Sequence, residues 1–395
     1  MKGFGLLLRI IVAIILGIIL GSFTPEWFIR LLATFNGLFG NFLSFIIPLI
    51  ILGFIAPGIG TLGRGASKLL GLTGLIAYIS TIIAGLFAYV VAKALYPTLL
   101  KGQAQTSLSD PTEKLVGPFI ELEIPAVMDV MTALVLAFVI GLGIVATKGD
   151  ILLNVMNELR SIVQLVIEKV IIPLLPIHIL GIFANMTYAG QVSTILHVFA
   201  KVFVMIIILH LLYLIAQYSV AGTLSKENPF IMLKTMLPAY FTALGTQSSA
   251  ATIPVTLERT KKLKVRERVA DFTVPLLANI HLSGSTITLV SCSLAVPFIQ
   301  GNSTSFGSFF AFILLLGVTM IAAPGVPGGA VMAAIGLLEI RLGFGPTMVS
   351  LMIALYMAQD SIGTACNVTG DGAITSIVNT INKKKKHEDF TEKVS

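Results

Sequence analysis

Long apolar runs separated by short polar segments are the main pattern along this chain. Several runs, such as "LLLRIIVAIILGIILGSF" and "FVMIIILHLLYLIA", approach or exceed the roughly 20 residues with which a helix crosses a hydrocarbon core. Because the apolar residues are continuous and do not alternate with polar ones, the runs predict helices and not the strands of a membrane barrel. The predicted spans lie near residues 4–22, 34–56, 70–95, 125–147, 160–187 and 194–221.

Two irregular stretches follow, and each precedes a long run that predicts a single helix. The stretches are 229–258 and 304–340, and the runs are 269–298 and 345–379. Each stretch contains a tip that mixes small residues with proline, "GTQSSAATIP" and "AAPGVPGGA". Such breaks free backbone polar groups, which persist at membrane depth only where protein or a water-filled cavity satisfies them. We therefore interpret the stretches as two re-entrant hairpins that form inverted repeats and mark a binding site.

Basic residues near the ends of the runs predict the topology. The segments "TKKLKVRER" and "KKKKH" are short and flank predicted helices, whereas most of the charged residues in the loop 97–124 are acidic. With cytoplasmic N- and C-termini, both basic segments fall inside and the acidic loop falls outside, as the positive-inside rule predicts. Full crossing by either irregular stretch would move a basic segment outside. The pattern therefore predicts eight transmembrane helices plus two re-entrant hairpins, in a plasma or inner membrane.

Composition agrees with an all-α integral membrane protein. Hydrophobic residues make up 56% of the chain and charged residues 11%, against about 25% charged in soluble proteins. The net charge of +7 lies largely in the segments that flank helices, so it does not predict nucleic-acid binding. Cys292 and Cys366 offer neither a disulfide framework nor a metal site. The chain shows no nucleophile elbow and no P-loop, which favours a coupled secondary transporter over an enzyme or an ATP-driven pump.

The last predicted helix carries a line of polar residues. Asp360, Thr364, Asn367 and Asp371 are spaced i, i+4, i+7 and i+11, which places them on one helix face. An unpaired carboxylate at membrane depth costs at least about 2.5 kcal/mol. We therefore expect this face to meet a cavity, a cation or a cationic group of a substrate. A polar seam between helices is the alternative, although no Lys or Arg occurs between residues 269 and 340 to pair with the carboxylates.

The histidines are interpreted differently according to their neighbours in the sequence. His281 lies in the polar patch "NIHLSGS", so it is either a hydrogen-bonded packing residue or a group that takes a proton or a cation. His178 and His210 lack comparable polar company in the sequence. We interpret these two as packing or interface residues.

These residues resemble the dicarboxylate/amino acid:cation symporters, a family that includes glutamate transporters and neutral amino acid exchangers. The resemblance covers nearly the whole chain and is strongest from Pro238 onward. Its most specific element is "NVTGD" at 367–371, supported by "TQSSAATIPVT" and "PGVPGG" in the two tips. It implies a homotrimer in which part of each protomer slides across the bilayer as an elevator. On this chain the scaffold would be about 1–69 and 96–190, the transport domain about 70–95 and 191–380, and a basic cytoplasmic tail 381–395.

The resemblance also implies a substrate site. Asp360 would hold the amino group of the substrate, and Asn367 would help to hold its carboxylate. The first tip would contribute backbone and hydroxyl contacts, and the second tip would close the site as a gate. The implied substrate-binding residues are Ser248, Ser249, Gly325, Val326, Asp360, Gly363, Thr364 and Asn367.

Na⁺ is the coupling ion that the resemblance implies. One site would combine the Asp371 carboxylate with backbone carbonyls, and a second would use backbone carbonyls between the patch at Asn279 and the second hairpin. The implied cation-binding residues are Leu277, Asn279, His281, Ile321, Ala323, Asn367 and Asp371. A third, weakened site would retain the hydroxyls of Ser80 and Thr81, but Ser283 stands where the family has an aspartate.

Departures from the family pattern bear on the substrate and on the ion. Gly363 and Gln247 stand where members that carry acidic substrates have arginine, so a second carboxylate would meet no fixed positive charge. We therefore predict a neutral amino acid as substrate. His281 and Ser283 replace an asparagine and an aspartate of the pattern, which predicts fewer coupled sodium ions and leaves a proton on His281 as an option.

The sequence thus predicts a symporter that couples a neutral amino acid to Na⁺, with no organic cofactor and no nucleic-acid partner. Coupling to protons, or an acidic amino acid or dicarboxylate as substrate, is the alternative within this class. A channel or a non-transporting membrane receptor is the alternative from another class. A channel would conduct without saturable dependence on substrate, and a receptor would bind without flux.

Overall fold

The computed structural model describes residues 6–64, 68–100, 115–122, 124–128, 130–190, 192–299, 305–321, 323 and 328–391, and the regular structure of these residues is helical throughout. The helices, in chain order, are α1 (Leu6–Phe23), α2 (Glu26–Arg64), α3 (Lys68–Leu99), α4 (Val130–Thr147), α5 (Asp150–Val166), the π-helical turn η1 (Ile167–Ile171), α6 (Ile172–Tyr188), α7 (Val192–Ser225), α8 (Pro229–Thr246), α9 (Ser249–Lys261), α10 (Glu267–Ile280), α11 (Ser283–Ile299), α12 (Phe306–Ile321), α13 (Gly329–Leu342) and α14 (Pro346–Thr391).

Helices occupy most of each of the six predicted spans, although α4 begins only at Val130 and residues 124–128 are not helical. Among the described residues, five segments are long and apolar enough to cross a bilayer, and three shorter helices are also apolar. The five segments are Glu26–Thr61, Leu69–Leu99, Asp150–Tyr188, Leu196–Ser225 and Glu267–Phe298. The span expected at 160–187 belongs to a longer continuous helix, because α5, η1 and α6 follow one another without a break.

Both irregular stretches fold as pairs of helices that pack against each other, α8 with α9 and α12 with α13. In the first pair, Gln247 adopts a left-handed conformation (φ 54°) and ends α8. Ser248 then begins α9, since its Oγ accepts a hydrogen bond from the backbone N–H of Ala251 (3.3 Å), as an N-cap residue does. In the second pair, residues 324–327 lie outside the described part of the chain.

The prediction of a single helix at 269–298 is wrong. The segment is divided into α10 and α11 by His281 and Leu282, and His281 has an extended backbone (φ −114°, ψ 92°). The sequence after the break, "SGS", is a poor continuation of a helix because serine and glycine have low helix propensity. A side chain from another helix, described below, binds the N–H groups that the break exposes, and so compensates for the interruption.

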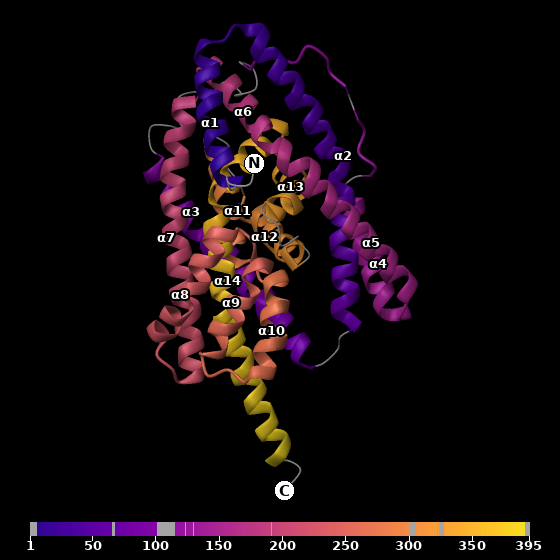
Figure 1. The fold of residues 1–395 in the computed structure, drawn as a ribbon, viewed down its shortest axis with the longest axis vertical. Coiled ribbons are helices and arrows are strands. Elements are labelled where there is room, and N and C mark those ends of the chain that lie inside the picture. The colour runs from indigo at the N-terminus through magenta and orange to yellow at the C-terminus, as the bar shows by residue number, and fades with distance from the viewer. Residues whose placement is uncertain are drawn as a thin grey trace.

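The helices form two groups that meet along one boundary. Helices α1, α2, α4, α5 and α6 pack mainly on one another, and α3 and α7 pack with α8 to α14. The groups meet mainly where α2 contacts α13 and where α1 and α6 contact α14. Figure 1 shows α14 running along the long axis of the molecule and extending beyond the other helices at its C-terminal end. The basic segment at 383–386 is part of this helix.

Helix α14 is the centre of the second group. It contacts α3, α7, α8, α9, α10, α11 and α13, and nearly every residue from 351 to 378 is buried. Because such a helix presents almost no face to lipid, its polar side chains meet protein groups instead of hydrocarbon. The fold thereby makes the polar line of the sequence possible.

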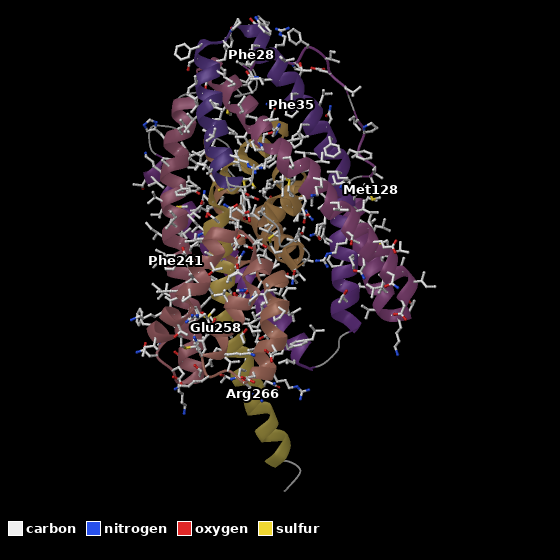
Figure 2. All side chains as sticks on the ribbon, in the orientation of Figure 1. Phe28, Phe35, Met128, Phe241, Glu258 and Arg266 are labelled. Carbon is white, nitrogen blue, oxygen red and sulfur yellow. The ribbon has the colours of Figure 1, made fainter. Side chains whose placement is uncertain are left out.

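The basic segment between α9 and α10 lies at the end of the molecule where α14 leaves the bundle. Lys264 pairs with Glu227 (2.8 Å), and Arg266 Nε donates to Asn379 Oδ1 (2.8 Å). Figure 2 shows Glu258 and Arg266 at this end and Phe28 at the opposite one. The two basic segments of the sequence are therefore brought to one end, as the predicted topology requires.

The segment 115–122 is fixed to α2 and α6 at several points. The amide of Asn185 both accepts from Val116 N (2.9 Å) and donates to Val116 O (2.8 Å). The N–H of Phe119 donates to Thr34 Oγ1 (2.8 Å), and Asn41 donates to the carbonyl of Leu122. Polar side chains of the two helices thus replace the regular structure that this segment lacks.

We expect Asn185→Ala to loosen this segment, because both backbone groups of Val116 lose their partner. Hydrogen–deuterium exchange should report a decrease of about 1–3 kcal/mol in the opening free energy around Val116. Asn154→Ala is the matched control, since Asn154 is exposed on α5. Equal exchange in the two variants would contradict the assignment of the Asn185 contacts.

Candidate functional site

The polar line of α14 is buried inside the protein. Asp360, Thr364, Asn367 and Asp371 are each at most 5% exposed. Asp360 faces the start of α13, Asn367 faces the start of α11, and Asp371 faces the end of α10. The line therefore meets the second hairpin and the break between α10 and α11, which are the two interrupted parts of the backbone next to it.

Asn367 binds the N-terminus of α11. Its Oδ1 accepts hydrogen bonds from the N–H groups of Gly284 (2.7 Å) and Ser285 (3.2 Å), and its Nδ2 donates to Ser285 Oγ (2.9 Å). These donors are among the first N–H groups of the helix, which have no partner within it. One Nδ2 hydrogen remains for another acceptor. Asn367 can therefore donate to a carboxylate at a helix N-terminus, where negative charge is stabilised.

The contact between α11 and α14 depends on Gly284. A Cβ atom at this position would lie 2.4 Å from the carbonyl oxygen of Gly363 and 2.6 Å from Cβ of Cys366. Gly363 itself is less restricted, because a Cβ atom there would meet its nearest neighbours at 3.6 Å. The position where acidic-substrate members carry arginine therefore has room for a methyl group in this structure.

Asp360 is bound to the second hairpin. Its Oδ2 accepts a hydrogen bond from the N–H of Gly328 (2.7 Å). Gly328 has a φ of +76°, a backbone conformation that favours glycine, and a Cβ atom there would also lie 2.7 Å from the sulfur of Met357. The predicted tip contacts Gly325 and Val326 lie outside the described residues.

Asp371 forms a buried pair with the side chain of His281. The distance between Asp371 Oδ1 and His281 Nδ1 is 2.9 Å, and both side chains are at most 1% exposed. The sequence analysis missed this pair, because it assigned His281 to the cation site through its backbone carbonyl. A signal was available, since a buried carboxylate needs a partner and no Lys or Arg occurs between residues 269 and 340.

The second nitrogen of His281 belongs to a hydrogen-bond network. Tyr213 donates its hydroxyl hydrogen to Ser80 O (2.6 Å), so the contact between Tyr213 OH and Ser80 Oγ (3.1 Å) uses the hydrogen of Ser80. Ser80 Oγ accepts from Gln217 Nε2 (3.0 Å) and lies 3.0 Å from His281 Nε2. His281 thus joins the carboxylate of Asp371 at Nδ1 to the polar side chains around Ser80 at Nε2.

A carboxylate oxygen and several backbone carbonyls near this network are acceptors that suit a cation. Asp371 Oδ2 is buried and has no hydrogen-bond partner among the described residues. The last carbonyls of α10 have no partners within their helix, and they form the negative end of its dipole. One of them, the carbonyl of Leu277, accepts a hydrogen bond from the backbone N–H of His281 (2.9 Å). No cluster of three His, Cys, Asp or Glu side chains occurs in the described part of the chain. The donor set of one carboxylate and backbone carbonyls therefore fits an alkali cation better than a transition metal.

The remaining cation-site residues are only partly brought together. Ser80 contacts His281, whereas Thr81 Oγ1 donates to the carbonyl of Ala77 in its own helix (2.9 Å). Ser283 Oγ is buried without a partner among the described residues. The side chain of Asn279 donates from Nδ2 to Pro275 O (2.9 Å). The backbone carbonyl of Asn279 lies at the end of α10.

Two further predicted positions, Ile321 and Ala323, lie at the end of α12. In the first hairpin, Ser248 caps α9 and Ser249 is buried.

His178 and His210, which the sequence predicts to be packing or interface residues, are buried and have polar partners on other helices. His210 Nε2 lies 2.9 Å from the carbonyl oxygen of Gly284 and 3.3 Å from Thr288 Oγ1. His178 Nε2 lies 3.1 Å from Ser350 Oγ, and its Nδ1 is 3.1 Å from the Asn36 amide. These partners come from helices far apart in the sequence, which explains why the local pattern did not reveal them.

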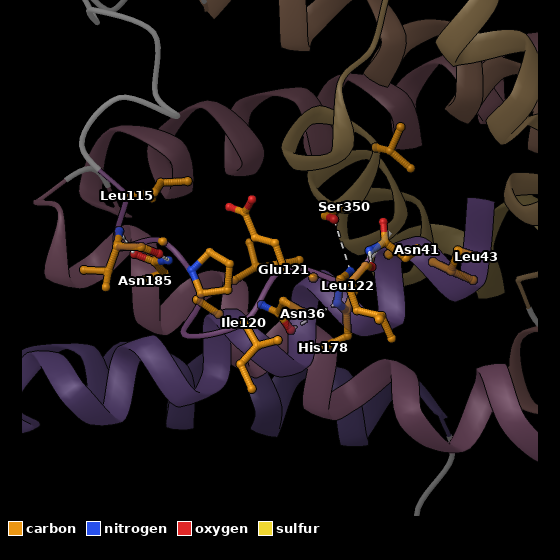
Figure 3. A pocket seen from close by; sticks show the side chains of 18 of the residues that line it. Asn36, Asn41, Leu43, Leu115, Ile120, Glu121, Leu122, His178, Asn185 and Ser350 are labelled. Carbon is orange, nitrogen blue, oxygen red and sulfur yellow. Dashed lines mark hydrogen bonds between the residues drawn. The ribbon is translucent and has the colours of Figure 1, made fainter. Parts of the chain in front are cut away.

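A cavity of about 480 Å³ lies away from the polar line, between α2 and α6 on one side and α13 and α14 on the other. Asn36, His178 and Ser350 are on its wall, and Figure 3 shows the hydrogen bond that joins His178 to Ser350 across it. The cavity contains none of the predicted site residues. It marks the boundary between the two groups of helices.

Known proteins resemble this chain over almost its whole length. The sequence profile of the sodium:dicarboxylate symporter family matches residues 6–381. A serine/threonine transporter, SstT, of Enterococcus faecalis is 25% identical over 97% of this chain and 93% of its own length. Two serine/threonine transporters of Acinetobacter baumannii strains are 26% and 27% identical, each over 94% of this chain and 96% of its own length. The resemblance inferred from the motifs is confirmed.

The close approach of α11 and α14 yields a paired prediction. Gly284→Ala should lower the free energy of unfolding by about 1–3 kcal/mol, because the methyl group forces apart two packed helices. Gly363→Ala, on the opposite helix of the same contact, should unfold like the wild type. Thermal unfolding in detergent measures both, and equal stability of the two variants would rule out the tight contact at Gly284.

Proposed function

Because the chain belongs to the sodium:dicarboxylate symporter family, and is therefore a multi-pass membrane transporter and not an enzyme, we propose that it is a Na⁺-coupled symporter of small neutral amino acids. Serine and threonine are the substrates that the names of the similar transporters favour. Gly363 supports the same choice, since it stands where acidic-substrate members have arginine. A dicarboxylate would bring a second negative charge to a site without a fixed cation to pair with it.

One observation carries the substrate assignment: a buried carboxylate and a buried amide lie on one face of α14, two turns apart. Asp360 offers an anion to the ammonium group of an amino acid. Asn367 offers its remaining N–H to the carboxylate, next to the positive end of α11. The two groups have the opposite electrostatic preferences that a zwitterion requires.

Na⁺ is proposed to bind at the end of α10 as a co-transported substrate. Asp371 Oδ2 and the backbone carbonyls of Leu277, His281 and Asn367 are its proposed ligands. The unpaired carboxylate oxygen supports this assignment, because a buried anionic oxygen is stable only beside a cation or a donor. The carbonyls around Asn279 and the end of α12 are proposed for a second ion, and Ser80, Thr81 and Ser283 for a weaker third.

Transport is proposed to follow an elevator mechanism in a homotrimer. The scaffold would be the group of α1, α2, α4, α5 and α6, and the moving part would be α3 and α7 to α14. The boundary between these groups supports the division, because it holds a cavity of about 480 Å³. The second hairpin is proposed as the gate, since opening it breaks the bond between Gly328 and Asp360. Eight spans, two re-entrant hairpins and cytoplasmic termini complete the proposal.

A second candidate for the coupling ion is the proton. The pair of His281 and Asp371 favours it, because an imidazolium supplies beside the carboxylate the positive charge that a sodium ion would otherwise supply. In this version the imidazole is deprotonated on one side of the membrane and reprotonated on the other.

Asp360→Asn should lower serine uptake into proteoliposomes by about 100-fold, because it removes the charge that pairs with the ammonium group in a buried site. Asp271→Asn is the matched control: Asp271 is half exposed and pairs with Lys261 at 2.8 Å, so uptake should stay near the wild-type rate. Unchanged uptake in Asp360→Asn would refute the proposed amine site.

The coupling ion is tested by imposing an inward gradient of Na⁺, of protons, or of neither, and measuring serine uptake. We expect uptake with Na⁺ alone, and loss of the thermal stabilisation by Na⁺ in Asp371→Asn. If protons are coupled, the proton gradient drives uptake without Na⁺, and His281→Asn abolishes that uptake while keeping the backbone carbonyl. Uptake without any gradient dependence would refute both forms of symport.

A further inference from the structure

Tyr356 extends the polar line of α14 by one turn. It precedes Asp360 by four residues and is 1% exposed. Its hydroxyl donates to Ser285 Oγ at 3.0 Å, so the side chain reaches from α14 to the first turn of α11. A tyrosine within an apolar run is normally interpreted as a core residue, and the sequence pattern alone gives it no role. Only the contacts of its hydroxyl in the fold indicate a role for Tyr356.

The phenol oxygen lies next to both groups that are proposed to bind the substrate. Ser285 Oγ, which accepts from Tyr356, also accepts from Asn367 Nδ2 (2.9 Å). On the other side, Tyr356 interacts directly with the carboxylate of Asp360. Tyr356 thus stands between the proposed amine site and the proposed carboxylate site, within one intervening side chain of each.

The chemistry of an α-amino acid then places its side chain near this phenol. The ammonium and carboxylate groups share one carbon atom, so a molecule bound by Asp360 and Asn367 has its Cα between them. At that level α14 has no side chain of its own, because the residue there is Gly363. The structure beside Gly363 is the first turn of α11, to which the ring of Tyr356 reaches. A substrate side chain that leaves Cα toward this turn would therefore approach the phenol.

We propose that Tyr356 determines the specificity of the site for small hydroxylated side chains, an inference that rests on the proposed function. The one hydrogen of the phenol is engaged by its acceptor neighbours, Ser285 Oγ or the Asp360 carboxylate, which leaves a lone pair on the oxygen to accept a hydrogen bond from the substrate hydroxyl. The aromatic ring fills the space beyond it and limits the length of the substrate side chain. A substrate without the hydroxyl leaves this buried acceptor unpaired, which is the basis of discrimination.

Tyr356→Phe tests the proposal, because it removes the oxygen and keeps the ring. Uptake by proteoliposomes is measured for serine against alanine, and for threonine against valine, which differ by the presence of the hydroxyl. We expect the ratio of kcat/KM values for serine over alanine to fall about five-fold, as for the loss of one hydrogen bond, and the ratio for threonine over valine to fall similarly. The loss should reside in the KM for the hydroxylated substrate.

Tyr96→Phe is the matched control. Tyr96 is equally buried, and its hydroxyl donates to the carbonyl of Ser291 at 2.6 Å, but it has no contact with the polar line. Both selectivity ratios should be unchanged in this variant. As a second measurement that needs no transport, the thermal stabilisation of the detergent-solubilised Tyr356→Phe protein by serine should fall toward that by alanine.

The outcomes separate this inference from the proposed function. If the wild type transports none of the four amino acids, the proposed function fails. If Tyr356→Phe raises the KM of serine and alanine by the same factor, Tyr356 only supports Asn367 through Ser285, and the specificity role is refuted. Unchanged ratios refute it as well. Only a selective loss for hydroxylated substrates, absent in Tyr96→Phe, sustains it.

Discussion

The break between α10 and α11 is the constraint on which the rest of the site depends. It exposes carbonyls at the end of one helix and N–H groups at the start of the next, and neither set can remain unsatisfied in a protein interior. Asn367 binds the N–H groups, while Asp371 lies beside the residue at the break itself. The polar residues on α14 therefore lie opposite the unpaired backbone groups at the end of α10 and the start of α11. One interruption creates an anion-binding end and a cation-binding end close together.

The pairing of Asp371 with His281 shows how the protein stabilises a carboxylate that has no Lys or Arg near it. A buried ion pair compensates only part of the cost of removing two charges from water, and here one carboxylate oxygen still lacks a partner among the described residues. The network of Ser80, Tyr213 and Gln217 holds the other nitrogen of the imidazole. Asp371 Oδ2 is thus held in place without a hydrogen-bond donor among the described residues. A carboxylate oxygen in this state is suited to bind a cation.

Sequence reasoning predicted what depends on periodicity and missed what depends on contacts between distant segments. The helical spans, the paired helices of the irregular stretches and the buried face with Asp360 and Asn367 all follow from apolar runs, breaks and helical spacing. The division at His281 did not follow, because Asn367, 86 positions later, supplies the compensating hydrogen bonds. The partners of His210 and Tyr356 were hidden for the same reason. The family was predictable from the motif "NVTGD". Two of its residues, Asn367 and Asp371, contact the two sides of the break between α10 and α11.

The bond between Asp360 and Gly328 links substrate binding to the position of the second hairpin. With the hairpin closed, the carboxylate of Asp360 is nearly excluded from water and receives one backbone N–H at Oδ2. Neutral groups such as the Gly328 N–H and the Tyr356 phenol compensate a buried anion poorly, so on the proposed function the closed and empty site is disfavoured relative to one in which water reaches Asp360. A substrate ammonium at the other oxygen removes this penalty without displacing Gly328. Closure then becomes favourable only when the site is filled, because the ligand binds the closed state better than the open one. On the proposed function, the charge that recognises the amine would thereby also oppose closure of the empty gate.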